Sequence, residues 1–294
     1  MAVSHMEVKE RFIAGKTNDE RDCEDEIVIN DHFVAVLDGA TSQIASEQGE
    51  LSPGKKAVNQ IAAELHALNG DVSMRECFYR INNAVAQIYL DEGIYEKARE
   101  KPEYRSSASA IVFSRFHSEI WSIGDCQALV DDRHITSWKS LENTLAETRA
   151  LFLESELERG KTINELRAED TGRLFIRELL VRQKLFQNRK SKHVHGYYVI
   201  DGFLESIEEA VEVYPVSKNT KSIVLSTDGY PSLRGTLRES EDFLRELLIR
   251  DPLCFREFKA TKGVYSGNRS FDDRAYVRLE LDPSFTTYTM ERGQ

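Results

Sequence analysis

The first regular pattern along the chain is a pair of short apolar runs. Ile27–Asn30 and Phe33–Leu37 are rich in β-branched and aromatic side chains, and the polar pair Asp31-His32 separates them. Such runs with a two-residue polar break predict two strands joined by a tight hairpin. The second run leads directly into Asp38, so the predicted strand would fix the position of that carboxylate.

Two helical patterns follow the hairpin. Between Pro53 and Leu68 apolar side chains recur at three- and four-residue spacing, and Asn69-Gly70 supplies a stop signal. A second stripe with the same spacing predicts another helix, and we expect both helices to pack on one face of a sheet. The apolar positions are Val58, Ile61, Ala62 and Leu65 in the first stripe and Cys77, Ile81, Val85, Ile88 and Tyr89 in the second.

Three more strands are expected before the middle of the chain. Ala108–Phe113, Glu119–Ile123 and Ala128–Asp131 are apolar runs separated by the turn residues Phe116-His117-Ser118 and Gly124-Asp125. Their close succession predicts an antiparallel meander.

The middle of the chain is highly charged, and its leucines and isoleucines recur at helical spacing. We interpret residues 132–196 as a helical insertion, which is either a lid over a site or a surface elaboration. Strand patterns return after it, around one further helix. Without repeats or proline-rich linkers, the order predicts a single α+β domain spanning residues 1–294. The later strands are predicted at Tyr197–Ile200, Ser222–Ser226 and Ala275–Leu281, and the helix at Glu239–Arg250.

Charge and cysteine content narrow the function. With 39 basic and 50 acidic residues the net charge is −11, which disfavours binding to nucleic acid or to an anionic membrane. Four widely spaced cysteines fit free thiols in a reducing compartment. Since there is no apolar run of about 18 residues and no secretory signal, we expect a cytoplasmic location. The opening residues 1–6 contain a second methionine and are given no functional weight.

Three acidic sites share one local design, in which a predicted strand meets an aspartate beside glycine or another aspartate. They are Val34-Ala-Val-Leu-Asp38-Gly39, Ile223-Val-Leu-Ser-Thr-Asp228-Gly229 and Asp272-Asp273-Arg-Ala-Tyr-Val277. A single motif of this kind is more often a turn than a metal ligand. Three such motifs at separate strand ends are less likely to arise by chance, and together they favour a metal site. Oxygen ligands of this kind suit Mg²⁺ or Mn²⁺. Two such ions roughly 3.5–4 Å apart can support hydrolysis of a phosphate ester without a protein nucleophile.

The acidic motifs, taken in chain order, resemble those of the type 2C metal-dependent protein phosphatases. The resemblance extends from Glu24 to about Leu281 and is absent between about Asp132 and Tyr197. It implies a four-layer αββα sandwich, that is, two antiparallel sheets flanked by helices. The motifs are Cys23-Glu24-Asp25, Val36-Leu37-Asp38-Gly39, Ser106-Ser-Ala-Ser-Ala110, Ile123-Gly124-Asp125-Cys126, Ser226-Thr-Asp228-Gly229 and Ser270-Phe-Asp272-Asp273.

The resemblance also implies an activity and a ligand set. The expected reaction is hydrolysis of phosphoserine or phosphothreonine in proteins by a hydroxide that bridges two Mn²⁺ or Mg²⁺ ions. Asp38 would contact both ions, Glu24 and the carbonyl of Gly39 would bind the second, and Asp228 and Asp272 the first. Asp125, together with Asp25, would approach a third ion.

Several positions depart from that family's pattern. Ala40-Thr41-Ser42 replaces the histidine and glycines that often follow Asp-Gly, so a metal-bound water would have to protonate the leaving group. The arginine that often clamps the substrate phosphate is also shifted, and of Lys16 and Arg21 we favour Arg21. Arg274-Ala275 follows the last motif where a small hydroxyl residue is common.

Other interpretations remain. The departures also fit a catalytically weak or inactive relative that binds a phosphorylated partner or regulates one. His193 and His195 are interpreted as part of a solvated basic loop, because two histidines without a third partner make a poor metal site. Cys126 lacks the Cys-x5-Arg loop of a cysteine phosphatase, and Val36 stands where an aspartyl nucleophile would be needed. The sequence indicates neither whether the phosphoester is a protein or a small molecule nor the oligomeric state.

Overall fold

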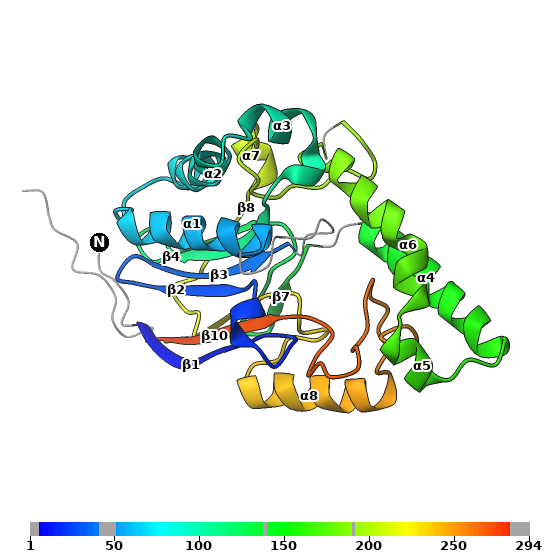
Figure 1. Cartoon of the computed structure of the whole chain (residues 1–294). Helices are drawn as coiled ribbons and strands as arrows, with labels where there is room; N and C mark the ends of the chain where they lie inside the picture. Colours follow the sequence, from blue (N-terminus) through cyan, green and yellow to red (C-terminus); the bar gives the residue numbers. More distant parts are fainter. Residues whose placement is uncertain (1–5, 41–50, 138–139, 190–191, 283–294) are drawn as a thin grey trace, which may run out of the picture.

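Within residues 6–40, 51–137, 140–189 and 192–282, which the computed structural model describes, ten strands form two five-stranded antiparallel sheets (Figure 1). Their orders are β1-β10-β9-β6-β7 and β2-β3-β4-β5-β8. The strands are β1 (Met6–Ala14), β2 (Glu26–Ile29), β3 (Phe33–Gly39), β4 (Ala108–Ser114), β5 (Glu119–Ile123), β6 (Gln127–Val130), β7 (Arg133–Ile135), β8 (Glu212–Pro215), β9 (Ser222–Ser226) and β10 (Arg274–Leu281). The helices are α1 (Pro53–Ala67), α2 (Met74–Asp91), α3 (Tyr95–Glu100), α4 (Ser140–Glu158), α5 (Ile163–Ala168), α6 (Thr171–Arg182), α7 (Ile207–Ala210) and α8 (Leu237–Arg250), with short 3-10 turns η1 (Glu20–Asp22), η2 (Pro102–Tyr104) and η3 (Gln183–Phe186).

The side chains of β3 show why this sheet packs against helices on one face and against the second sheet on the other. Phe33, Ala35 and Leu37 belong to the core cluster that includes the buried faces of α1 and α2. Val34 and Val36 alternate with them and pack between the two sheets. Because successive side chains of a strand point to opposite faces, both faces of β3 are buried. The strand therefore appears in the sequence as an uninterrupted apolar run.

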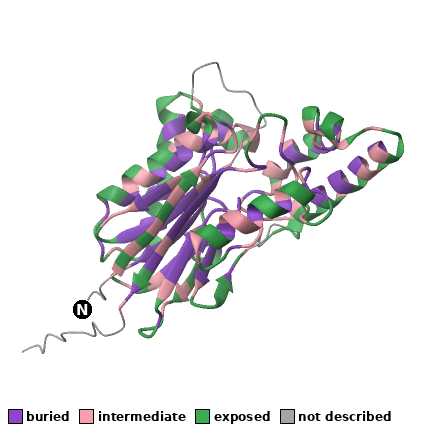
Figure 2. Ribbon diagram, turned by 90° about the horizontal axis from the view of Figure 1, so that it is seen from below, coloured by how far each residue is buried: buried purple, intermediate pink, exposed green. Residues whose placement is uncertain are grey.

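The other sheet is layered in the same way. Ile223 and Leu225 of β9 pack between the sheets, whereas Val224 points outward into a cluster that includes Leu244 of α8. Figure 2 shows the buried residues concentrated on the strands and on the inner sides of the helices. The predicted four-layer αββα sandwich of two antiparallel sheets is confirmed.

Most predicted elements are present, and their ends follow local signals. Ser52 caps α1 by accepting a hydrogen bond from the Lys55 amide, and Ser73 caps α2 in the same way. The charged middle of the chain forms α4, α5 and α6, an insertion between β7 and β8 that extends to one side of the sandwich (Figure 1). No helix in the described ranges is long and apolar enough to span a membrane.

Two strand predictions were wrong. β6 does not continue a meander with β4 and β5, because after Gly124-Asp125 the chain crosses to the other sheet, where β6 pairs with β7 and β9. Residues 197–200 form no strand, since Tyr197 and Ile200 make only isolated bridges, to Gln187 and Ala108. Apolar character there reflects packing and not ladder pairing.

Three edge strands, β1, β7 and β8, were not predicted from the sequence patterns. β1 begins at Met6, within the opening stretch that was given no weight, and pairs along its length with β10. β7 and β8 have three and four residues, too few to show a period. None of these three strands has more than one buried residue, so their apolar signal is weak.

Candidate metal centre

Four aspartates from different strand ends line one cavity of about 120 Å³. Asp38 lies near the end of β3, Asp125 in the turn between β5 and β6, Asp228 just after β9, and Asp272 just before β10. Asp38, Asp125 and Asp228 each offer a carboxylate oxygen, and these oxygens all lie within 4.8 Å of one another. Asp272 lies outside that group of three but faces the same cavity.

Asp125 is held in place by its surroundings. Ser109, the β4 residue paired with Asp38, donates a hydrogen bond of 2.5 Å to Asp125 Oδ1. The preceding Gly124 has φ +86°, and a Cβ atom there would lie 2.1 Å from Ser109 Oγ. Only glycine combines this backbone conformation with so close an approach. The crossover between the sheets thus carries Asp125 to Asp38.

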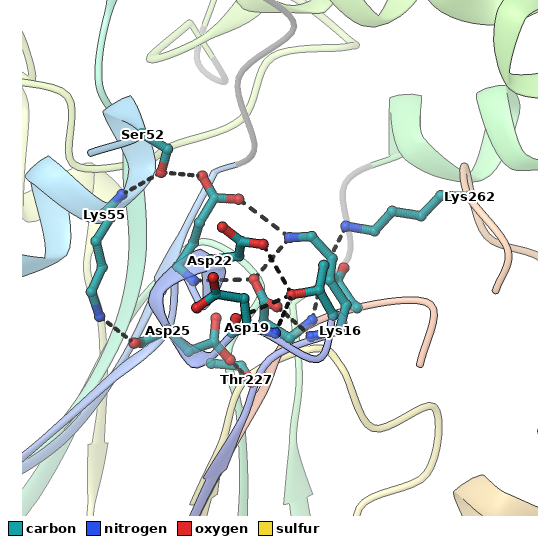
Figure 3. Close-up of polar contacts among 12 residues, drawn as sticks. Lys16, Asp19, Asp22, Asp25, Ser52, Lys55, Thr227 and Lys262 are labelled. Atoms are coloured by element: carbon teal, nitrogen blue, oxygen red, sulfur yellow. Dashed lines mark hydrogen bonds and ion pairs between the residues drawn. The ribbon is translucent and has the colours of Figure 1, made fainter. Parts of the chain in front are cut away.

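Thr227 fixes the backbone next to Asp228. Its hydroxyl donates to Asp25 Oδ2 at 2.8 Å and accepts from the amide of Ala275 at 2.9 Å (Figure 3). One side chain therefore links the end of β9 to the start of β10 and to the segment that precedes β2. That link brings three distant parts of the sequence together beside the cavity.

A second cluster of opposite charges lies beside the first. Lys16 forms an ion pair of 2.8 Å with Asp273 and approaches Glu24 at 3.4 Å. Ser52 donates to the other oxygen of Glu24 at 2.6 Å (Figure 3). Burial lowers the pKa of Lys16, but Asp272, Asp273 and Glu24 together raise it above its ordinary value. This cluster ties the N-terminal segment to the loop that carries Asp272.

Carboxylates in this region repel one another. Burial raises the pKa of Asp228 well above its ordinary value, and the charge of Asp38 is the second cause of this increase. Burial, and next the charge of Asp273, does the same for Asp25, even though Thr227 donates to it. Both shifts show that the charged forms lack enough nearby positive charge. A divalent cation would supply that charge.

The expected ligands for a second ion lie next to each other. Both Gly39 and the Glu24 carboxylate pack against Gly54. A Cβ atom on Gly54 would lie 2.8 Å from Glu24 Oε1 and 2.8 Å from the Gly39 carbonyl carbon. Glu24 is 5% exposed and Asp25 is 1% exposed. Asp125, which the resemblance assigns to a third ion, lies in the same group of three carboxylates as Asp38 and Asp228.

Arg21 is not brought to the cavity. Its side chain is 88% exposed and forms an ion pair with Asp19 in the same short turn. It does not line the cavity that contains Asp38 and Asp228. The turn η1 directs Arg21 into solvent because Asp19 both caps the turn and binds the guanidinium.

Three basic side chains that the sequence did not single out line the cavity instead. Arg173 and Lys184 come from the insertion, and Lys262 from the loop before β10. Lys262 Nζ lies 2.5 Å from Asp272 Oδ1 (Figure 3). No local motif marks these residues, because each lies in a segment where charged residues are frequent.

Other reactive side chains are outside this site. Cys126 is buried, and burial raises the pKa of its thiol well above its ordinary value, as expected for a structural cysteine. All four cysteines are buried and free. Among the described residues, the rings of His193 and His195 lie 5.6 Å apart and belong to no group able to hold a metal.

The chemistry of the donor set suits a hard cation. Its members are carboxylates, with a backbone carbonyl at Gly39, and neither thiolate nor imidazole takes part. Mg²⁺ and Mn²⁺ prefer such oxygen ligands. Burial and the charges of the same carboxylates raise the pKa of Asp228, which a bound cation would offset.

Comparisons with known proteins add a likeness of fold. No protein-family model matches the sequence, and no curated protein matches it. Among solved structures, a bacterial serine phosphatase is 14% identical, with a TM-score of 0.45, over 95% of this chain and 98% of its own. The serine/threonine phosphatase PstP/Ppp of Mycobacterium tuberculosis is 15% identical, with a TM-score of 0.44, over 94% and 99%. Stp1 from Staphylococcus aureus is 13% identical, with a TM-score of 0.41, over 96% of each chain. The likeness is structural only.

Proposed function

We propose that the protein is a metal-dependent phosphatase that hydrolyses phosphate monoesters, with phosphoserine and phosphothreonine in proteins as its substrates. The observation that carries the proposal is the meeting of Asp38, Asp125 and Asp228, from three separate strand ends, within 4.8 Å of one another. A cavity lined by both acidic and basic side chains surrounds them. Carboxylates there suit cations, and basic groups suit the phosphate.

The residues take distinct roles in this proposal. Asp38, Asp125 and Asp228 hold Mn²⁺ or Mg²⁺, with Asp272 lining the same cavity and Glu24 close to the Gly39 carbonyl. When bound, two such ions would supply a water of lowered pKa and would polarise the phosphoryl oxygens. Ser109 orients Asp125, and Thr227 orients Asp25 beside the site, through the hydrogen bonds described above. Such oriented ligands raise the affinity of a metal site.

The test is phosphate release that depends on the metal and on the cluster. Wild-type protein with Mn²⁺ should release phosphate from a phosphothreonine peptide, and Asp38→Ala should reduce the rate to background. Asp132→Ala is the matched control, because Asp132 is an exposed aspartate in the turn before β7. Absence of turnover in wild-type protein with either metal would contradict the proposal.

One contact favours a second candidate function. Lys262 binds the carboxylate of Asp272, so that oxygen is already engaged by a protein cation. A protein that binds a phosphorylated partner without hydrolysing it would fit this arrangement. Calorimetry that detects binding of the phosphopeptide, together with no release of phosphate over hours, would select this function over the first.

A further inference from the structure

The cavity needs positive charge beyond that of the metals. Four aspartates and Glu142 line it, so two divalent cations leave no positive charge to spare. A phosphoryl group that enters adds negative charge again. Charged hydrogen bonds from protein donors are the usual means of binding such a group.

The basic residues of the central loops are already engaged by carboxylates. Lys262 binds Asp272 at 2.5 Å, and Lys16 binds Asp273 at 2.8 Å. Arg21 lies in solvent, paired with Asp19. None of the three is well placed to bind a substrate phosphate without breaking an existing ion pair.

Arg173 and Lys184 differ because their hydrogen bonds go to neutral oxygens. Arg173 Nη1 donates to the carbonyl of Thr261 at 2.8 Å, and Lys184 Nζ donates to the carbonyl of Arg105 at 2.8 Å. Within the described residues neither side chain forms an ion pair. A guanidinium has five donors and an ammonium three, so each retains donors for an anion.

Both residues lie on one face of the same helical segment. Arg173 is in the first turn of α6 and Lys184 is in η3, which continues α6. Leu180 lies between them at spacings of seven and four, and all three line the cavity with Asp38 and Asp228. Helical periodicity therefore places both charges on the side that faces the carboxylates.

The segment is fastened at both ends, which fixes the two charges. At the start of α6, Asp170 accepts from the Arg173 amide at 2.8 Å and forms an ion pair with buried Arg149. At the other end, buried Asp201 accepts from Gln187 at 2.6 Å, just after η3. Donors held in this way bind an anion without a further ordering cost.

We propose that Arg173 and Lys184 form a phosphate-binding subsite, contributed by the helical insertion, that holds the phosphoryl group of the substrate against the metal centre. This subsite rests on the proposed function and assigns the phosphate-binding role to the insertion and not to Arg21. It also gives the insertion a defined task, as a fixed wall of the cavity.

The test measures binding of inorganic phosphate to Mn²⁺-loaded protein by calorimetry, which needs no turnover. Arg173→Gln and Lys184→Gln should each weaken phosphate binding about tenfold or more. Arg177→Gln is the matched control, since Arg177 is an exposed arginine of the same helix, and should bind phosphate as the wild type does. In parallel, the KM for p-nitrophenyl phosphate should rise more than kcat falls.

Charge-conserving variants distinguish the loss of a charge from the loss of folded structure. Arg173→Lys and Lys184→Arg should retain most of the phosphate affinity, and circular dichroism should show that every variant is folded. If Arg173→Gln and Lys184→Gln bind phosphate as tightly as Arg177→Gln, or if wild-type protein binds none, the inference is overturned. If wild-type protein shows no turnover but its phosphate binding depends on Arg173 and Lys184, the subsite holds and the phosphatase activity does not.

Discussion

The strongest structural prediction concerns Arg149, which pairs with Asp170 inside the insertion and binds the loop after α8. Arg149 of α4 is fully buried and lies 2.6 Å from the 4% exposed Asp170. Its guanidinium also donates to the carbonyls of Leu253, Cys254 and Ala260 at 2.9 to 3.2 Å. One side chain therefore joins α4, the start of α6 and the loop after α8.

Arg149→Met keeps the apolar length of the side chain and removes every one of these bonds. Asp170 would then remain as a buried charge with the Arg173 amide as a donor. The carbonyls of Leu253 and Ala260 would lose the bond from Arg149, whereas that of Cys254 would keep the amide of Ala260. Removal of one partner of a buried pair costs about 3–5 kcal/mol. The same substitution at Arg159, which is 80% exposed and lies 3.6 Å from Glu156, should cost at most about 0.5 kcal/mol.

Urea unfolding followed by circular dichroism measures both losses, and hydrogen exchange locates them. Amides of α6 should lose protection in Arg149→Met while those of β3 and β4 keep theirs. The double variant Arg149→Met with Asp170→Asn should lose less free energy of unfolding than the two single variants together, because it no longer contains a buried, unpaired carboxylate. A loss below about 1 kcal/mol in Arg149→Met, the value of a surface pair, would refute this reasoning.

Three further predictions concern the site itself. Saturating Mn²⁺ should raise the melting temperature by about 5–10 °C, because a ligand at 100 times its Kd contributes about 2.7 kcal/mol, and in Asp38→Asn the shift should vanish. Burial lowers the pKa of Lys184 to about 8, so its charge is present below and lost above that pH. The KM for a phosphoester should therefore rise above pH 8, and Lys184→Arg should flatten that profile; an unchanged profile would contradict the role of this charge. Gly124→Ala should lower the free energy of unfolding, measured in urea, by about 2 kcal/mol or more, because its Cβ would meet Ser109 Oγ. Gly160→Ala, at a similar φ but with open space around it, should lower it less. Equal losses in the two variants would show that the clash is not the cause.

Much of the fold could be predicted because its strands are buried on both faces. β3 and β9 contain uninterrupted apolar runs at residues 33–37 and 223–225, and β10 has apolar residues at 275–277. α1, α2 and α8 show a regular stripe with capping residues at their starts. These local signals agree with the final structure. The sheet to which a strand belongs depends on pairing with strands that are distant in sequence. β6 was placed in the wrong sheet for this reason, since its partner β9 lies about 100 residues further along the chain.

The acidic part of the site could be predicted because strand ends carry carboxylates to shared edges. Asp38 and Asp228 do meet, as the strand-end motifs indicated, but the third member of the group is Asp125, and Asp272 lines the same cavity outside that group. The basic part could not be predicted, because Arg173 and Lys184 reach the cavity only through the packing of the insertion. Arg21, chosen for its nearness in sequence to Glu24, points to solvent because Asp19 binds it locally.

The most direct test of the metal centre is a crystal structure of Mn²⁺-soaked protein with anomalous data at the manganese edge. The account predicts anomalous peaks in the cavity, in contact with the carboxylates of Asp38, Asp125 and Asp228, and two ions roughly 3.5–4 Å apart. No peak in that cavity at saturating Mn²⁺, or ions bound only elsewhere on the surface, would contradict it.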